Sequence, residues 1–387
     1  MITNKKQKGQ YFTKNAELKK AVHEFIRNEP AKILEPSMGR GDLVEYVSNK
    51  IPDVEFDLYE IDEEIEFLES VKRENICIGD FLSFQIPTKY DTIIGNPPYV
   101  KTKKGNLYID FIEKCFNLLN EMGELIFIVP SDFIKLTSSG SILNKMTENG
   151  TFTDIFRPNN EKMFEDASID VMVFRYCKNK ELSNKISVNG SEKYLLNING
   201  VLTFSDHGVV SPLFSEYFDV YVGMVSGREE VFKNEKHGNI EILNDENKKE
   251  KYILINKFRT KNEELNQYML SNKESLINRK IRKFTNNNWF EWGALRNFKT
   301  IQNITLSNTQ SPNCIYVKNV TRSDKVCFIA PVQLFGGGLI AMIPKKSIDL
   351  AKVTQYINST AFKSNYTYSG RFKIGHRQLR NSLLYSS

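Results

Sequence analysis

The chain has 387 residues, a hydrophobic content of 40%, a charged content of 26% and a formal net charge of +6 at pH 7. These values are typical of a soluble globular protein with room for two domains, each with its own core. The apolar run at residues 125–130 is far too short to cross a bilayer, and residues 1–6 carry charge with no apolar core behind them. We therefore expect no membrane span and no secretory signal.

The five cysteines lie far apart, their number is odd, and no Cys-x-x-Cys pair is present. This usage indicates reduced thiols in a cytoplasmic protein and argues against a disulfide framework or a zinc site. The four histidines are scattered as well. We expect that catalysis runs without a bound metal.

Charge is unevenly distributed along the chain. Residues 1–180 contain 24 Lys and Arg against 29 Asp and Glu, a balance of −5, whereas residues 181–387 contain 29 against 18, a balance of +11. A basic C-terminal half after a slightly acidic N-terminal half is typical of a polyanion-binding module joined to a catalytic one. A basic surface that serves only solubility is the alternative.

The first 180 residues alternate apolar runs with helical patterns. The predicted helices cover residues 43–49, 63–72 and 109–122, and Gly123 is the expected C-cap of the last one. Strands separated by helices predict a mostly parallel sheet with helices on both faces, in which ligands bind beyond the carboxyl ends of the strands. The predicted strands cover residues 31–34, 53–59, 75–78, 92–94 and 124–130, with 152–156 and 170–176 as a closing pair.

Polar or glycine-containing loops follow four of these strands, at residues 35–42, 60–62, 80–81 and 96–99. We expect them to meet at one edge of the sheet. The glycines of the first loop let the backbone approach a small ligand, and an acidic residue that closes the second strand suits ribose hydroxyls. No phosphate-binding glycine motif is present, so the pattern favours a nucleoside cofactor without phosphates.

The fourth loop, Asn96-Pro97-Pro98-Tyr99, combines groups that could make an exocyclic amine nucleophilic. The side-chain carbonyl of Asn96 and the backbone carbonyl of Pro97 could both accept from the NH2 group. The two prolines stiffen the loop, and Tyr99 offers a flat face to a base. A rigid turn with no ligand is the alternative.

Five motifs together resemble the amino-methyltransferases that use S-adenosylmethionine, and more narrowly the gamma (Taq-type) group of DNA adenine-N6 methyltransferases of restriction–modification systems. The resemblance covers residues 7–180. One departure is Ser37-Met38-Gly39-Arg40, where many relatives carry small residues before the glycine, so Met38 and Arg40 are expected to alter the fit of the cofactor. The motifs are Gly9-Gln10-Tyr11-Phe12-Thr13, Leu34-Glu35-Pro36-Ser37-Met38-Gly39-Arg40-Gly41, Tyr59-Glu60-Ile61-Asp62, Gly79-Asp80-Phe81-Leu82 and Gly95-Asn96-Pro97-Pro98-Tyr99.

The resemblance implies a role for each matching residue. The N-terminal motif and the first loop would hold the methionine part of the cofactor, the second loop the ribose and the third the adenine. The fourth loop would hold the target amine, and Phe164 would flank the flipped base together with Tyr99. The implied cofactor-binding residues are Tyr11, Thr13, Glu35, Gly39, Glu60, Ile61, Asp80, Phe81 and Asn96, and the implied catalytic residues are Asn96, Pro97, Tyr99 and Phe164.

The resemblance also implies an architecture and a reaction. Residues 1–180 would form an α/β catalytic domain on a doubly wound, mostly parallel, seven-stranded sheet, and residues 181–387 a mixed α+β target-recognition domain. The enzyme would transfer a methyl group from S-adenosylmethionine to N6 of a flipped-out adenine in double-stranded DNA. It would act as a cytoplasmic monomer, with any cognate restriction endonuclease encoded separately.

Basic residues in the C-terminal half lie among aromatics and glycines, a mixture that suits phosphate binding and base reading. A solvated basic face would look the same. The candidate DNA contacts are Lys318, Arg322, Arg371, Lys373 and Arg377.

Two other interpretations of the function remain open. A protein-glutamine or RNA amino-methyltransferase shares the Asn-Pro-Pro-Tyr motif, although the glutamine enzymes usually place a small helical domain before the catalytic one. A DNA-binding protein that has lost catalysis is the other, and the intact Asn96, Tyr99 and Glu60 speak against it.

Overall fold

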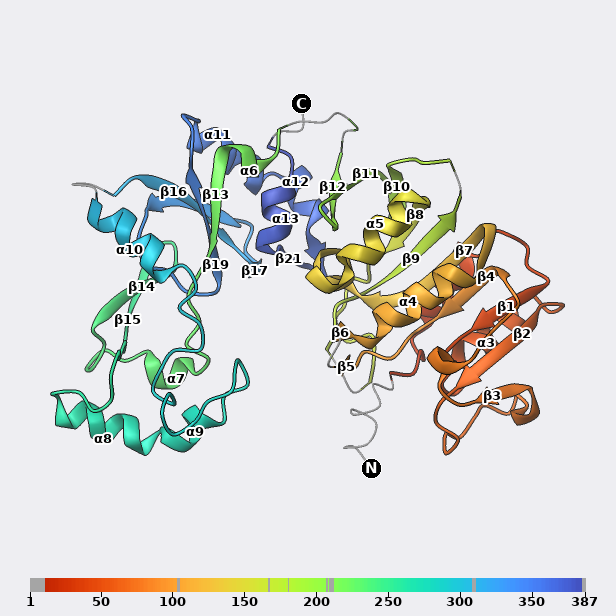
Figure 1. Cartoon of the computed structure of the whole chain (residues 1–387). Helices are drawn as coiled ribbons and strands as arrows, with labels where there is room; N and C mark the ends of the chain where they lie inside the picture. The colour runs from red at the N-terminus through yellow and green to blue at the C-terminus, as the bar shows by residue number, and fades with distance from the viewer. Residues whose placement is uncertain are drawn as a thin grey trace. The chain divides into compact units, whose positions relative to one another are not determined.

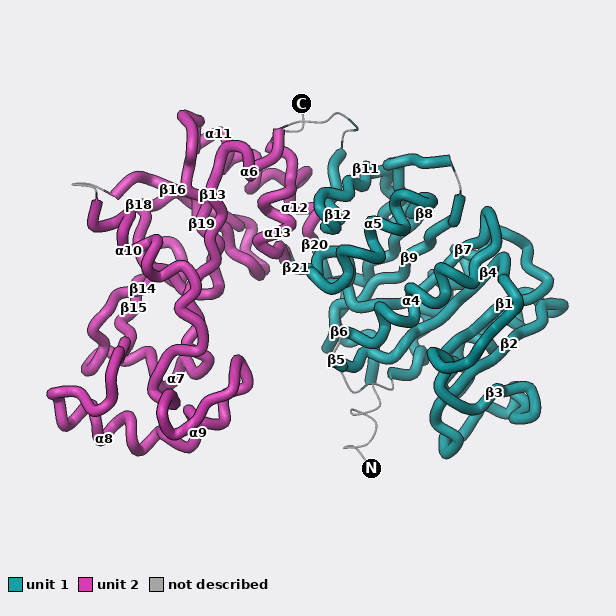
Figure 2. The backbone as a smooth tube through the Cα atoms, in the orientation of Figure 1, with its two compact units in different colours: residues 1–210, 367–371, 386–387 teal, residues 211–366, 372–385 magenta. Residues whose placement is uncertain are grey.

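The computed structural model in Figure 1 describes residues 11–102, 105–165, 168–179, 181–206, 208, 212–307 and 311–384. The chain forms two compact units, coloured separately in Figure 2. Unit 1 comprises residues 1–210, 367–371 and 386–387, and unit 2 comprises residues 211–366 and 372–385. The predicted domain boundary at residue 180 lies inside unit 1, whose sheet is extended by strands at residues 185–205.

Unit 1 is built on a ten-stranded sheet with the order β12-β11-β10-β8-β9-β7-β4-β1-β2-β3. The five neighbouring strands β7, β4, β1, β2 and β3 are mutually parallel. In contrast, β9 is antiparallel to both of its neighbours, β7 and β8. The predicted mostly parallel sheet is confirmed, but β10, β11 and β12 add three strands to the expected seven. The strands are β1 Lys32–Glu35, β2 Glu55–Glu60, β3 Ile76–Ile78, β4 Tyr90–Gly95, β7 Leu119–Pro130, β8 Gly150–Phe156, β9 Val171–Lys178, β10 Lys185–Val188, β11 Ser191–Ile198 and β12 Val201–Ser205.

Helices cover both faces of this sheet because its central strands are apolar on both sides. Along β7, Leu125, Phe127 and Val129 pack in one cluster with α4 (Leu107–Leu118) and α5 (Gly140–Glu148). Ile126 and Ile128 pack in another cluster with α2 (Ala16–Phe25) and α3 (Asp42–Ser48). The two-residue period of a strand thus distributes one continuous apolar run between two cores.

Two predicted helices differ from the structure. Residues 63–72 form turns rather than a helix, and only a short 3-10 helix, Arg73–Asn75, follows them. Four glutamates crowd this stretch, and the Leu68 N–H donates to the Arg40 carbonyl at 3.0 Å instead of to a helical partner. The helix predicted at 109–122 ends at Leu118, because β7 begins at the next residue and pairs there with β4.

Unit 2 has the mixed α+β character that the sequence predicts. Its four-stranded antiparallel sheet has the order β13-β19-β16-β18. A separate hairpin, β14 and β15, packs with helices around Trp289 and Trp292. The strands of the sheet and the hairpin are β13 Phe218–Val222, β14 Ile240–Asp245, β15 Lys248–Tyr252, β16 Asn313–Lys318, β18 Cys327–Pro331 and β19 Leu339–Pro344. The helices are α6 Phe214–Tyr217, α7 Glu229–Phe232, α8 Glu263–Ser271, α9 Lys273–Ile277, α10 Phe298–Ser307, α11 Leu350–Asn358, α12 Thr360–Asn365 and α13 His376–Asn381.

The remaining strands are short: β5 Lys101–Thr102, β6 Gly105–Asn106, β17 Val320–Thr321, β20 Thr367–Tyr368 and β21 Arg371–Lys373. Over the residues that the structure describes, every helix is too short or too polar to traverse a lipid bilayer.

A buried ion pair joins the middle strands of unit 1. Glu124 on β7 is fully buried and lies 2.7 Å from the guanidinium of Arg175 on β9. The same carboxylate accepts from the Thr92 hydroxyl at 2.9 Å and from the Arg27 N–H at 3.1 Å. Because water cannot solvate Glu124, its charge depends on these partners.

Arg175→Met should lower the free energy of unfolding by about 3–5 kcal/mol, since the variant leaves a buried carboxylate without its cation. Urea denaturation of the two proteins measures the change. Lys185→Met is the control, because its ion pair with Glu192 is exposed and should contribute little. Equal effects of the two substitutions would contradict this account.

Candidate functional site

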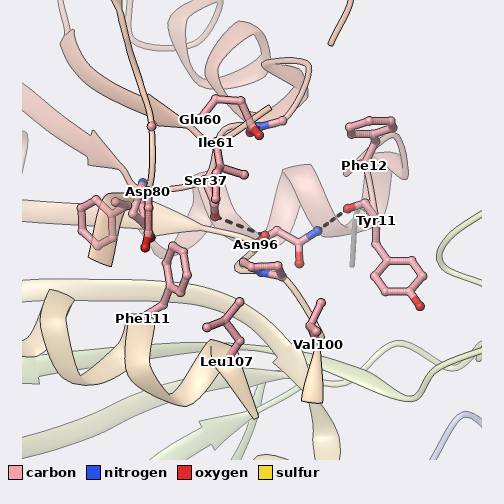
Figure 3. Close-up of a pocket in the computed structure, with 15 residues that line it drawn as sticks. Tyr11, Phe12, Ser37, Glu60, Ile61, Asp80, Asn96, Val100, Leu107 and Phe111 are labelled. Atoms are coloured by element: carbon pink, nitrogen blue, oxygen red, sulfur yellow. Dashed lines mark hydrogen bonds between the residues drawn. The ribbon is translucent and has the colours of Figure 1, made fainter. Parts of the chain in front are cut away.

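The four predicted loops of unit 1 meet at an open cavity of about 890 Å3, drawn in Figure 3. The cavity lies beyond the carboxyl ends of β1, β2, β3 and β4, as expected for a parallel sheet. Its lining residues are Tyr11, Phe12, Pro36, Ser37, Gly39, Glu60, Ile61, Gly79, Asp80, Phe81, Asn96, Pro98, Val100, Leu107 and Phe111.

A smaller cavity of about 260 Å3 adjoins the first and shares residues such as Gly39 and Asn96 with it. Thr13, Glu35 and Asp42 contribute to its wall. All nine residues named above as implied cofactor contacts line one of these two cavities. Sequence reasoning brought them together correctly in space, although their role as cofactor contacts remains a prediction.

Glu60 shapes the first loop from the end of β2. Its side chain accepts from the Gly39 N–H at 2.8 Å and from the Asp62 N–H at 2.9 Å. Burial raises the pKa of Glu60, while these backbone hydrogen bonds act in the opposite direction. Gly39 has φ of +58°, and a Cβ atom there would lie 3.1 Å from the Phe12 ring. The carboxylate and the glycine together fix a tight turn that leaves room for a ligand.

Three buried oxygens in the wall of the smaller cavity have no hydrogen-bond partner among the described residues: Oε2 of Glu35, Oδ2 of Asp42 and Oδ1 of Asn96. Arg40 Nε is 3.9 Å from the Asp42 oxygen, beyond hydrogen-bonding range. Buried acceptors without partners are uncommon and costly, so their gathering at one place indicates a site for a donor, such as an ammonium group.

A flat apolar wall lies on the other side of the larger cavity. The rings of Phe81 and Phe111 stack with centroids 5.5 Å apart and planes at 22°. Asp80 precedes this wall and accepts from the Leu82 N–H at 3.0 Å. Ile61 is 64% exposed although it is large and apolar. A carboxylate at the edge of apolar surfaces suits a flat heterocycle that carries an amino group.

The orientation of the Asn96 amide follows from its neighbours. Its Nδ2 donates to the Tyr11 carbonyl at 2.7 Å and to the Thr13 hydroxyl at 3.0 Å, and Figure 3 shows the first of these bonds. A backbone carbonyl can only accept, so the nitrogen must face Tyr11 and the oxygen must face away from it. Asn96 Oδ1 is therefore held in place as an acceptor without a partner.

Three aromatic rings gather beside Asn96. Tyr11 stacks on Tyr99 with centroids 5.5 Å apart and planes at 30°, and it lies equally far from Phe164. Tyr99 and Phe164 contact each other edge to face at 6.1 Å. The Tyr99 hydroxyl donates to the Ile128 carbonyl at 3.1 Å, which fixes its ring. Tyr99, Phe164 and the buried Pro97 do not line either cavity but border the site.

Two of the candidate DNA contacts are engaged within their own units. Lys318 lies 2.7 Å from Asp245, and its side chain is only 16% exposed. Arg371 binds both Asp170, at 3.0 Å, and Glu161. Two carboxylates thus already neutralise the charge of Arg371, and its contact with DNA stays a prediction.

The other three candidates differ in exposure. Arg322 is exposed, and Lys373 and Arg377 are half-buried. Their role in DNA binding remains a prediction.

Several cavity residues were missed from the sequence. Asp42 falls within the predicted first loop, but nothing in the sequence showed that its carboxylate would lack a partner. Leu107 and Phe111 are spaced four residues apart on a helix, the pattern of an ordinary core-facing pair. Ser37, which donates to the Asn96 carbonyl at 3.4 Å, carried no signal beyond its place in the loop.

The stability of the protein should depend on pH through Glu35. Burial raises the pKa of this carboxyl from 4.5 to about 8, and the nearby Glu60 adds to the rise. The folded state thus keeps a proton that the unfolded state releases. The resulting stabilisation is complete below pH 4.5 and is lost as the pH rises through about 8.

Glu35→Gln cannot ionise and should flatten the decline in unfolding free energy between these two pH values. Urea midpoints across that range measure it, with the exposed Glu17→Gln as control. A decline in Glu35→Gln as steep as in the wild type would show that Glu35 does not cause it.

The sequence is similar to that of known restriction-modification methylases. Residues 12–164 match the family model described as Eco57I restriction-modification methylase. The Type II methyltransferase M.HincII of Haemophilus influenzae is 30% identical over 208 residues, covering 48% of this chain and 40% of that protein. The Type II methyltransferase M.AccI of Acinetobacter calcoaceticus is 24% identical over 220 residues, covering 49% and 40%. The matched region is thus about two fifths of the length of these curated relatives.

Among solved structures, the cryo-EM structure of a DrdV–DNA complex resembles the chain with a TM-score of 0.50 and 11% identity. The match covers 89% of this chain and 50% of that one. At this level of identity it supports the fold alone.

Proposed function

We propose that this chain, whose residues 12–164 form an Eco57I-type restriction-modification methylase domain, is a DNA methyltransferase that uses S-adenosylmethionine to methylate N6 of adenine. The observation that carries the proposal is the acceptor oxygen of Asn96, buried and without a partner where the two cavities meet. Neighbouring groups would supply the cofactor site and the base site, and the basic C-terminal half would supply the DNA contacts.

The residues of the two cavities fit S-adenosylmethionine. The unpartnered oxygens of Glu35 and Asp42 would accept from its ammonium group, Glu60 would hold its ribose, and Asp80 would accept from its adenine amino group. Phe81, Phe111 and Ile61 would pack against the adenine ring. When bound, this cofactor supplies an electrophilic methyl group on a sulfonium centre.

The amine of adenine is a poor nucleophile because its lone pair is delocalised into the ring. By accepting from the amine N–H, Asn96 Oδ1 would draw the nitrogen toward tetrahedral geometry, and the Pro97 carbonyl would accept the second N–H. The two acceptors would also stabilise the positive charge that develops on nitrogen. The rate would come mainly from positioning and from these fixed dipoles, and the released proton would leave to water.

An adenine inside a duplex cannot reach this loop, so it must swing out at a cost of a few kcal/mol. Stacking against Tyr99 and Phe164 would return about 1–3 kcal/mol for each aromatic face. The Tyr11 ring lies against Tyr99 in this structure, so it must move before a base can stack there.

Two observations favour DNA over RNA or protein as the proposed substrate. The relatives M.HincII and M.AccI are named Type II methyltransferases, and residues 181–387 carry a net charge of +11 that favours a polyanion. The alternative is a protein-glutamine or RNA amino-methyltransferase, since the amine chemistry of the Asn96 loop is the same. A cytoplasmic, monomeric enzyme with a separately encoded endonuclease completes the proposal.

Asn96→Ala should lower the rate of methyl transfer by roughly 100-fold or more, because it removes an acceptor aimed at the reacting amine. Binding of S-adenosylhomocysteine should stay close to that of the wild type. The rate is measured with radiolabelled cofactor and genomic DNA from a host without adenine methylation.

Asn28→Ala is the matched control, since Asn28 also donates two hydrogen bonds through its amide, to the carbonyls of Asp91 and Met122. It should retain activity. Turnover like that of the wild type in Asn96→Ala would refute the mechanism, and no labelled DNA from active, folded wild type would favour an RNA or protein substrate.

A further inference from the structure

The segment 367–371 lies late in the chain but belongs to unit 1, while the residues before and after it belong to unit 2 (Figure 2). The segment packs on the loop that joins β8 to β9, residues 157–170, of which the structure describes 157–165 and 168–170. This loop carries Phe164. The contacts are concentrated at its two ends.

At the start of the loop, the guanidinium of Arg157 lies between the rings of Phe204 and Tyr368, 4.2 and 4.6 Å from their centroids. Tyr368 is 2% exposed and belongs to the main hydrophobic core of unit 1. A buried guanidinium between two rings gains both cation–π attraction and packing. The aromatic residue of the segment thus anchors the first residue of the loop.

At the end of the loop, Asp170 accepts from the Ser369 hydroxyl at 2.7 Å and from Arg371 at 3.0 and 3.1 Å. The other guanidinium nitrogen of Arg371 contacts Glu161, nine residues earlier in the chain. The Ile169 N–H donates to the Glu161 carbonyl at 3.0 Å, which closes the loop on itself. One arginine therefore links two residues of the loop, Glu161 and Asp170, that stand on either side of Phe164 in the sequence.

Between these ends, Phe164 is 5% exposed and contacts the rings of Tyr11 and Tyr99. In the sequence, Phe164 stands between Glu161 and Asp170, the two residues that Arg371 binds. A fixed aromatic ring next to Asn96 loses less conformational entropy on binding a base than a mobile one.

We propose that Arg371 is a positioning residue, which holds Phe164 in place for the target base by bridging Glu161 and Asp170. The proposal rests on the proposed function insofar as a base stacks on Phe164. In this proposal Arg371 bridges two residues of the same unit instead of contacting DNA. Since the segment continues directly into unit 2 at both ends, it connects the methylase unit to the basic part of the chain.

The first test needs no activity. Hydrogen–deuterium exchange in peptides within residues 157–165 should be faster in Arg371→Ala than in the wild type. The matched control is Arg27→Ala, which breaks a bidentate ion pair to the buried Asp154 in the same unit, 2.8 and 2.9 Å long, and does not touch the Phe164 loop. Unchanged exchange in folded Arg371→Ala, or an equal rise in Arg27→Ala, would overturn the proposal whatever the protein methylates.

The second test is a double-mutant cycle on the single-turnover methylation rate of unmethylated genomic DNA. Phe164→Ala and Arg371→Ala should each slow the reaction by about tenfold, as expected for the loss of one stacking face. Together they should slow it no more than Phe164→Ala alone, since Arg371 acts through Phe164. Losses that multiply would instead support a direct DNA contact by Arg371 and contradict the proposal.

Glu161→Gln is the milder variant if Arg371→Ala fails to fold, because Glu161 is 27% exposed and its loss leaves the pair with Asp170. It should raise exchange of the loop by a smaller factor, and no rise at all would count against the proposal. A wild type that methylates no DNA would refute the proposed function and leave the exchange result to decide the role of Arg371.

Discussion

The two hydrogen bonds that the Asn96 amide donates determine what this site can do. Because Tyr11 offers a carbonyl and Thr13 a hydroxyl, the amide nitrogen is committed to the N-terminal segment and the oxygen is left as a fixed acceptor. The N-terminal segment, which comes before the first strand of the sheet, thus orients a residue that follows β4. A site assembled from such distant parts requires the sheet beneath it to be rigid, and the buried Glu124–Arg175 pair ties its middle strands together.

The acidic residues of the two cavities differ in their hydrogen bonds and in their burial. Glu60 accepts one backbone hydrogen bond on each carboxylate oxygen and so shapes the first loop, whereas Glu35 and Asp42 each keep an oxygen without a partner among the described residues. Burial raises the pKa of Glu35 to about 8, so a cationic ligand would stabilise the charged form of this carboxyl. The apolar wall of Phe81 and Phe111 offers no charge and suits a neutral ring. The arrangement favours a ligand with a cationic end and an aromatic end.

Much of the site could be predicted because the carboxyl ends of parallel strands meet at one edge of a sheet, where Gly39, Asp80 and Asn96 follow strands and Glu60 ends one. The family match then confirmed the expected class of methylase domain, while the gamma grouping stays a prediction. The helix predicted at residues 63–72 is wrong although its apolar residues have helical spacing. Clustered glutamates disfavour a helix there, and the backbone makes contacts with the first loop instead. Arg371 could not be assigned, since its partner Asp170 lies 201 residues away and only tertiary structure brings them together. The strands β10, β11 and β12 were not predicted because they follow residue 180, where the resemblance ends, and only the folded structure shows that they join the sheet of unit 1.

The central claim is that the oxygen of Asn96 activates the amine of adenine in DNA. The most direct measurement is mass spectrometry of nucleosides from unmethylated genomic DNA after incubation with the protein and S-adenosylmethionine carrying a deuterated methyl group. The account predicts deuterated N6-methyladenine as the labelled nucleoside. Labelled N4-methylcytosine, or label found in RNA or protein and absent from DNA, would contradict it.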